Sequence, residues 1–385
     1  MPIAALTRPR VVMGLMFFPR GGSAQVARGL AHVLARQRWD VTIVSGSLRL
    51  PGRPGDAHLF FSGLDVSPVD YTAALEAADP LCADSPLHPS YEDRPGAPDR
   101  VFATVDDSTY EHLVASWARV LRQAGAATAD ILHLHHLTPL NEAAARVAPD
   151  VPVVGHLHGT ELLLLEAIAS GPPVHWVHAE VWAQRMRRWA AACQRLVVPS
   201  ATQLTRAQEL LQLDPDRYVH LPNGFDPGRF DRRPIDRLTL WRQLLVERPC
   251  GWCPGGEPGS VVYAPHLLRS FAQGPVLLYV GRFTAVKRLG LLISAYSRAQ
   301  ASFAVPAPLV LLGGFPGEWE GEHPLDTIQR LGARDVFLAG RHLRSAARSV
   351  SRHLTESSPA GVPCTPAAHW EVGFPFRPFS LWFST

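Results

Sequence analysis

The chain has 385 residues, of which 46% are hydrophobic and 18% are charged, and its formal net charge is +3. This composition is ordinary for a soluble globular enzyme, and the length suits two medium-sized domains. The charge is too small to indicate nucleic acid or an anionic membrane as partner, although peripheral membrane contact stays open. Without an 18-residue apolar run or an apolar leader, we expect neither a transmembrane segment nor secretion. Five mostly scattered cysteines favour a reducing cytoplasm.

The chain opens with a predicted β-α-β unit. Residues 10–19 read as a buried strand, Gly21-Gly22-Ser23 forms a turn, an amphipathic helix follows, and residues 41–45 form a second strand. This order predicts a parallel sheet. Glycines in such a turn let a ligand approach the backbone closely. The absence of G-x-G-x-x-G counts against an NAD dehydrogenase.

Residues 48–100 are rich in Pro, Gly and Asp and show no lasting periodicity of apolar residues. We therefore interpret them as a long irregular excursion from the domain that is present for a functional reason. Helices are predicted for residues 107–124 and 176–193. The second helix carries three arginines that we expect to be solvated, namely Arg185, Arg187 and Arg188.

Two predicted strands end in histidines, one carrying His133, His135 and His136 and the next carrying His156 and His158. Because parallel strands end at one edge of a sheet, these imidazoles should gather there. Three interpretations compete. A zinc site is disfavoured by an unrecognised ligand spacing and the lack of Cys or paired carboxylates. The others are structural histidines bonded to nearby carbonyls, and a histidine that faces a substrate.

The second half of the chain begins after a turn at Pro222-Asn223-Gly224. Residues 231–275 are rich in Arg and Pro and lead into a second domain. They contain Cys250 and Cys253, whose C-x-x-C spacing we attribute to chance because no second Cys pair accompanies it.

A strand, turn and helix follow at residues 276–300, with Arg282 and Lys287 in the turn. Two cations beside a helix N-terminus suit a pyrophosphate. Lys287 is the single lysine among 37 Lys and Arg residues. This suggests that the site requires the compact charge of an ammonium group rather than the planar guanidinium of an arginine. The alternative is that Lys287 is an ordinary solvated surface charge.

Strands are predicted at residues 308–314 and 336–340, with an acidic insertion, GEWEGEHP, between them. After Gly340 neither a 3.6 nor a 2.0 period survives. Our hypothesis is that residues 341–385 come from a shifted reading frame or a truncated gene product. A divergent native C-terminus is the milder alternative.

Four of these segments resemble glycosyltransferase family 4, the retaining enzymes of GT-B fold: PRGGSA, the His158-Gly159 strand end, PNG-x-D-x-x-x-F, and GRFTAVKR at residues 281–288. The resemblance implies that Arg282 and Lys287 hold the diphosphate of a nucleotide-sugar. It further implies that Gly22 lies close to the donor phosphate and His158 close to the transferred sugar, the other four histidines being structural. The family's second-domain pair of glutamates has no counterpart in the sequence after Gly340.

We therefore predict an α/β chain of two Rossmann-like domains (GT-B), the C-terminal one incomplete. The predicted segments are an acceptor domain (1–221), a linker (222–275), a partial donor domain (276–340) and the tail (341–385). The implied reaction transfers a sugar from a nucleotide diphosphate-sugar, the co-substrate, to an acceptor hydroxyl with retention, without a metal or other cofactor. A nucleotide-sugar-binding remnant and a GT-B-like nucleotide-sugar epimerase are the alternatives.

Overall fold

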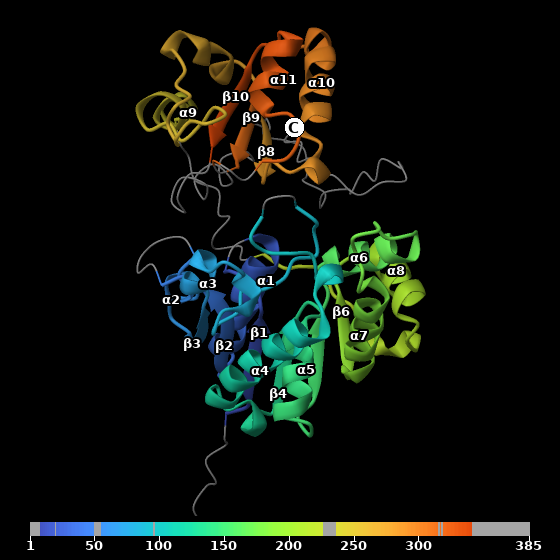
Figure 1. Ribbon diagram of the computed structural model, residues 1–385. Coiled ribbons are helices and arrows are strands. Elements are labelled where there is room, and N and C mark those ends of the chain that lie inside the picture. The colour runs from blue at the N-terminus through green and yellow to red at the C-terminus, as the bar shows by residue number, and fades with distance from the viewer. Residues whose placement is uncertain are drawn as a thin grey trace, which may run out of the picture. The chain divides into compact units, whose positions relative to one another are not determined.

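The computed structural model describes residues 8–19, 21–49, 55–94, 97–225, 236–314, 316 and 319–340. The chain divides into two compact units, Met1–Phe225 and Asp226–Thr385. In Figure 1 the first unit runs from blue to yellow-green and the second from yellow to orange-red. The tail at residues 341–385, with the hypothesis attached to it, lies outside the described residues, as do Asp226 and Phe230.

The first unit is built on a seven-stranded parallel sheet with the strand order β3-β2-β1-β4-β5-β6-β7. The strands are β1 (Arg10–Leu15), β2 (Asp40–Ser47), β3 (Asp65–Asp70), β4 (Ile131–His135), β5 (Val153–His156), β6 (Arg195–Val198) and β7 (Tyr218–His220). The order reverses between β1 and β4. In open parallel sheets, ligands bind outside the carboxyl ends of the strands at such a reversal.

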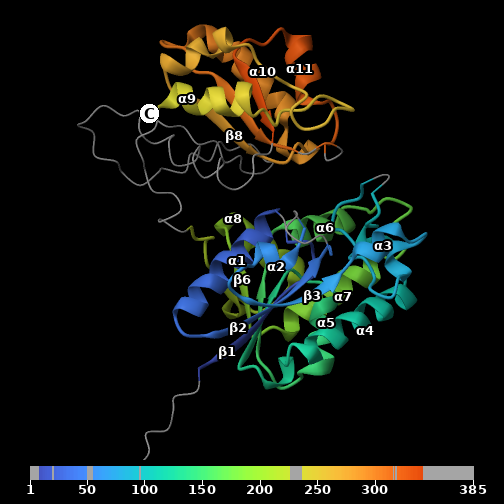
Figure 2. The same ribbon diagram turned by 90° about the vertical axis from the view of Figure 1, so that its left-hand side faces the viewer.

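Helices cover both faces of this sheet, as Figure 2 shows. They are α1 (Gly21–Arg36), α2 (Ala57–Phe60), α3 (Thr72–Glu76), α4 (Asp107–Gln123), α5 (Pro139–Val147), α6 (Thr160–Ala169), α7 (Ala179–Ala192) and α8 (Ala201–Leu211). On one face, alanines of α1 pack closely on Val11, Met13 and Leu15 of β1. On the other face, apolar residues of α4, α5 and α7 form the larger core. Burial of these two apolar faces is the main stabilising contribution to the fold.

The second unit holds a three-stranded parallel sheet with the order β10-β9-β8, made of β8 (Leu277–Gly281), β9 (Leu309–Gly313) and β10 (Val336–Gly340). Helices α10 (Leu289–Ala299) and α11 (Pro324–Leu331) belong to the core cluster on one face. The other face packs on α9 (Arg237–Arg242), a π-helical turn (Gln243–Glu247) and a 3-10 helix (Pro265–Ala272). Residues 237–275, predicted as a linker, thus supply Trp241 and Phe271 to this core.

Three local features differ from the sequence-based expectations. The excursion at residues 48–100 contains β3, an edge strand that pairs with β2 and includes Pro68, which an edge tolerates because one side of the strand needs no partner. Helix α1 begins at Gly21, so the glycine pair forms its first turn. Arg185 is buried rather than solvated, because its guanidinium stacks 3.7 Å from the Tyr110 ring centroid and bonds Asp107.

Within the described residues, no helix combines the length and apolar character needed to cross a bilayer. Cys82, Cys193, Cys250 and Cys253 are free thiols.

Candidate functional site

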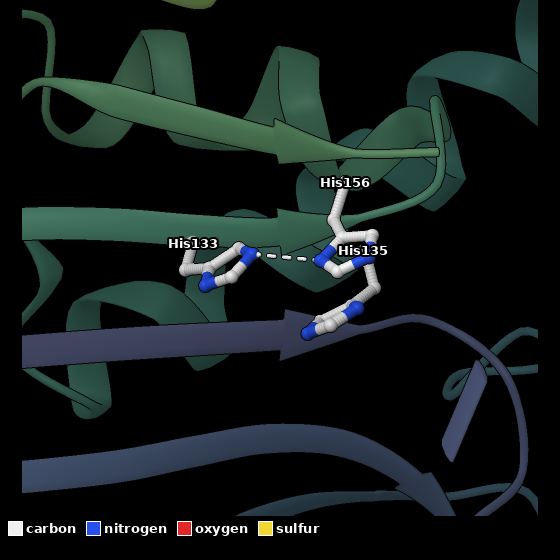
Figure 3. Close-up of side chains that lie close together, drawn as sticks. All are labelled: His133, His135 and His156. Carbon is white, nitrogen blue, oxygen red and sulfur yellow. Dashed lines mark hydrogen bonds between the residues drawn. The ribbon is translucent and has the colours of Figure 1, made fainter. Parts of the chain in front are cut away.

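Histidines occupy the carboxyl ends of β4 and β5, beside the point where the strand order reverses (Figure 3). His135 is the last residue of β4 and pairs in register with His156, the last residue of β5. His133 lies two residues before His135, so its side chain points to the same face of the sheet. All three side chains are buried. Central strands of parallel sheets are normally near-continuous apolar runs, so three imidazoles here break the pattern.

The rings bond to one another. His133 Nε2 lies 3.3 Å from His156 Nδ1, and His135 Nδ1 lies 2.9 Å from Nε2 of His158, two residues past the end of β5. Burial lowers the pKa of His133 to about 3 and that of His156 to about 4, Glu161 and Asn223 opposing the effect at His156. Burial also holds the pKa of His135 and of His158 well below the usual value. These imidazoles are therefore neutral at physiological pH, and each can accept at one nitrogen.

Glu161, in the first turn of α6, holds this end of the sheet together. Its fully buried carboxylate accepts from the backbone N–H of His158 at 3.1 and 3.2 Å and lies 3.0 Å from Nδ1 of His136. Burial by itself raises the pKa of Glu161, but the His136 imidazole and the N–H bonds outweigh it, so the pKa lies below its usual range. Sequence reasoning gave Glu161 no role. The available signal was an acid three residues after His158, the spacing at which a helix-start carboxylate reaches back to a backbone N–H.

Two glycines shape the backbone around these side chains. Gly159 caps α6 in the left-handed region at φ +88°, and a Cβ there would lie 2.3 Å from Nε2 of Gln203, so the turn after His158 requires glycine. Gly22 lies in the exposed first turn of α1, and a Cβ there would meet open space. Gly22 lies at the N-terminus of α1, where the first backbone N–H groups have no acceptor within the helix.

The second unit presents the basic loop between β8 and α10. Arg282 and Lys287 are both exposed on it, while Phe283 between them is buried and anchors the loop. The Tyr279 hydroxyl donates to the carbonyl of Arg282 at 2.6 Å. Among the described residues, no side chain caps α10. Two exposed cations on a strand-to-helix loop are suited to a phosphate group.

The acidic insertion packs against this loop. Glu320 accepts from the amide of Ala285 at 2.9 Å, and its own amide donates to the carbonyl of Phe283 at 2.9 Å. A hollow of about 250 Å³ lies between the two segments, with Arg288, Glu320 and Glu322 in its wall. Neither Arg282 nor Lys287 lines it. The first residues of α10, from Leu289 to Leu291, line the same hollow.

The predicted site residues thus fall into two groups. His158 and Gly22 lie at the carboxyl edge of the first sheet, and Arg282 and Lys287 lie on one loop of the second unit. Two Rossmann-like units, each with its polar groups past the strand ends, define an α/β enzyme of GT-B fold, the architecture of nucleotide-sugar-dependent glycosyltransferases.

The particular family follows from residues 20–229, which match the family model of Glycosyltransferase Family 4. These are 210 of the 385 residues, so the chain belongs to glycosyltransferase family 4 and is a glycosyltransferase, an enzyme of sugar transfer from a nucleotide-sugar donor. No curated protein matches the sequence.

Solved structures resemble the chain in fold. HepE from Anabaena, in complex with UDP and glucose, is 14% identical with a TM-score of 0.52, over 89% of this chain and 72% of that one. Sucrose-phosphate synthase from Thermosynechococcus elongatus is 13% identical with a TM-score of 0.55, over 90% and 74%. The catalytic domain of starch synthase IV from Arabidopsis thaliana, bound to ADP and acarbose, is 12% identical with a TM-score of 0.53, over 90% and 76%.

Proposed function

We propose that this chain transfers a hexose-type sugar from a nucleotide diphosphate-sugar to an acceptor hydroxyl, with retention of configuration and without a metal in the transfer step. The observation that carries the proposal is the basic loop of the second unit, where Arg282 and Lys287 are both exposed between β8 and α10. The first unit would bind the acceptor and the second the donor. The cytoplasmic location expected from the cysteines is part of the same proposal.

In this mechanism the leaving group is a nucleoside diphosphate, which gains negative charge as the glycosidic bond breaks. Arg282 and Lys287 neutralise that charge, so no metal ion is needed for it. Gly22, with open space at its Cβ, leaves the first amides of α1 accessible to a phosphate group. His158, the one partly exposed ring among the five histidines, faces the transferred sugar. Two fold relatives favour a diphosphate donor, since HepE was solved with UDP-glucose and starch synthase IV with ADP.

Turnover decides between this function and its alternatives. The full chain is incubated with UDP-, GDP- and ADP-glucose and a panel of sugar and lipid-linked acceptors, and release of the nucleoside diphosphate is measured. We expect release that depends on an acceptor, and an α-linked product by NMR from an α-linked donor. A β-linked product would contradict retention. Conversion of the donor without any acceptor would indicate an epimerase, and binding without release would indicate a remnant.

Matched variants locate the site. Lys287→Ala should lower turnover, whereas Arg298→Ala removes an exposed cation at the far end of α10 and should leave it unchanged.

A further inference from the structure

The histidines of β4 and β5 have a property that sugar transfer does not use. One nitrogen from each of His133, His135 and His156 lies within 4.8 Å of one nitrogen from each of the other two. Figure 3 shows the three rings gathered at the ends of two neighbouring strands. From these positions we propose that His133, His135 and His156 form a zinc-binding site in the first unit.

The spacing of one pair already fits a metal. Zn–N bonds of about 2.0–2.1 Å at tetrahedral angles place two ligand nitrogens about 3.3–3.4 Å apart. His133 Nε2 and His156 Nδ1 lie 3.3 Å apart, bridged by one proton. The ring planes are 13° apart, so the two lone pairs must turn towards a common point by rotation about the side-chain bonds. When zinc enters, the bridging proton moves to the other nitrogen of its own ring, and both rings stay neutral.

His135 supplies the third ligand through Nε2. That atom is buried and has no hydrogen-bond partner among the described residues, a costly state for a polar atom. Its other nitrogen, Nδ1, bonds Nε2 of His158. In zinc-bound histidines the second ring nitrogen usually makes a hydrogen bond of this kind, which fixes the orientation of the ring and its tautomer. Zinc at this site would therefore fix the orientation of His158 as well.

The residues around the three histidines favour zinc over Mg²⁺ and Ca²⁺. In register beside the histidines lie Met13 and Leu15 on β1 and Val197 on β6, and none of these side chains offers an oxygen or nitrogen ligand. The nearby carboxylate of Glu161 is already engaged by His136 and the amide of His158. Neutral imidazoles without carboxylates favour zinc and similar transition metals over Mg²⁺ or Ca²⁺, which prefer oxygen. The proposal departs from the sequence-based expectation, which disfavoured zinc for lack of Cys or paired carboxylates, because three clustered histidines with an open fourth position are themselves an established zinc ligand set.

The strands pre-position the ligands. Positions 133 and 135 share one face of β4, and the backbone ladder sets position 156 opposite 135. Zinc binding then requires side-chain rotations only, so little ordering cost opposes it.

The test is direct zinc binding by the metal-stripped full chain, measured by competition with a chromophoric chelator. We expect one Zn²⁺ per chain and none of Mg²⁺, and the visible absorption of tetrahedral Co²⁺ when cobalt replaces zinc. His133→Ala and His156→Ala should weaken zinc binding by more than the roughly 10–100-fold that loss of an outer-shell partner costs. His58→Ala, an exposed histidine on α2, is the matched control and should bind as the parent does.

His133→Phe and His156→Phe each keep a packed ring without a lone pair, so these variants separate lost ligation from lost folding. Thermal unfolding checks that each variant folds. The proposal is overturned if the folded parent takes up no zinc, or if uptake is unchanged in the alanine and phenylalanine variants. No nucleotide or sugar enters this assay, so its outcome is independent of the proposed transfer reaction.

Discussion

Replacing Glu161 by alanine tests how the edge of the first sheet is held. The carboxylate is fully buried, and its loss leaves the amide of His158 and the Nδ1 of His136 without their partner. A buried donor left without its acceptor costs about 1–3 kcal/mol, so two such donors cost about 2–6 kcal/mol. At about 2–4 °C per kcal/mol for a unit of this size, the melting temperature of the first unit should fall by about 4–24 °C.

Glu161→Gln should cost less, because an amide keeps the shape and one acceptor but loses the charge. Hydrogen bonds to a charged group contribute about 1.5–3 kcal/mol, which sets the scale for this variant. The assay is urea unfolding of the full chain, and the control is Glu180→Ala, an exposed glutamate on α7 whose nearest arginine nitrogen, on Arg187, is 3.7 Å away. A free-energy change for Glu161→Ala within about 0.5 kcal/mol, the range of ordinary surface changes, would refute the reasoning.

Three further predictions concern single positions. Gly159→Ala forces a left-handed residue against Gln203, so it should cost about 1–2 kcal/mol in urea unfolding and reduce turnover, whereas Gly22→Ala, with open space at its Cβ, should cost less than 1 kcal/mol. Trp241→Ala should cost about 3–5 kcal/mol by the same method, because the ring is buried in the second core; a neutral result would mean that this segment is a linker after all. The amide of Thr109 and neighbouring hydroxyls lower the pKa of the Asp106 cap to about 2, so its stabilisation is complete above about pH 4 and is lost as pH falls through 2. Asp106→Asn should keep the cap but lose that acid dependence, which thermal melts between pH 5 and 2 would detect.

Much of the fold follows from local patterns in the sequence. The predicted strand at 336–340 coincides with β10, and the helix predicted from residue 107 begins there because the side chain of Asp106 caps it. In both elements the pattern of apolar residues is clear, and residues that start or end such an element bound it. Strand β3 was missed, since an edge strand containing Pro68 buries little and shows no alternation. Arg185 was misjudged because its partners, Tyr110 and Asp107, lie on a helix distant in sequence.

The site was only partly predictable. The gathering of histidines followed from parallel strands ending together, and the basic loop followed from a strand, turn and helix with two cations. The hydrogen bond between His135 and His158, and the carboxylate of Glu161 beneath them, depend on side-chain directions that residue spacing does not fix.

Binding of UDP, GDP and ADP to the full chain, measured by calorimetry beside Lys287→Ala, tests the donor site most directly. We expect one of these diphosphates to bind the parent. Lys287→Ala should weaken that binding by about 10–150-fold, the equivalent of a charge-assisted hydrogen bond, while Arg298→Ala binds as the parent does. If a folded parent binds none of the three, or if Lys287→Ala binds as tightly as the parent, the basic loop is not a donor-diphosphate site.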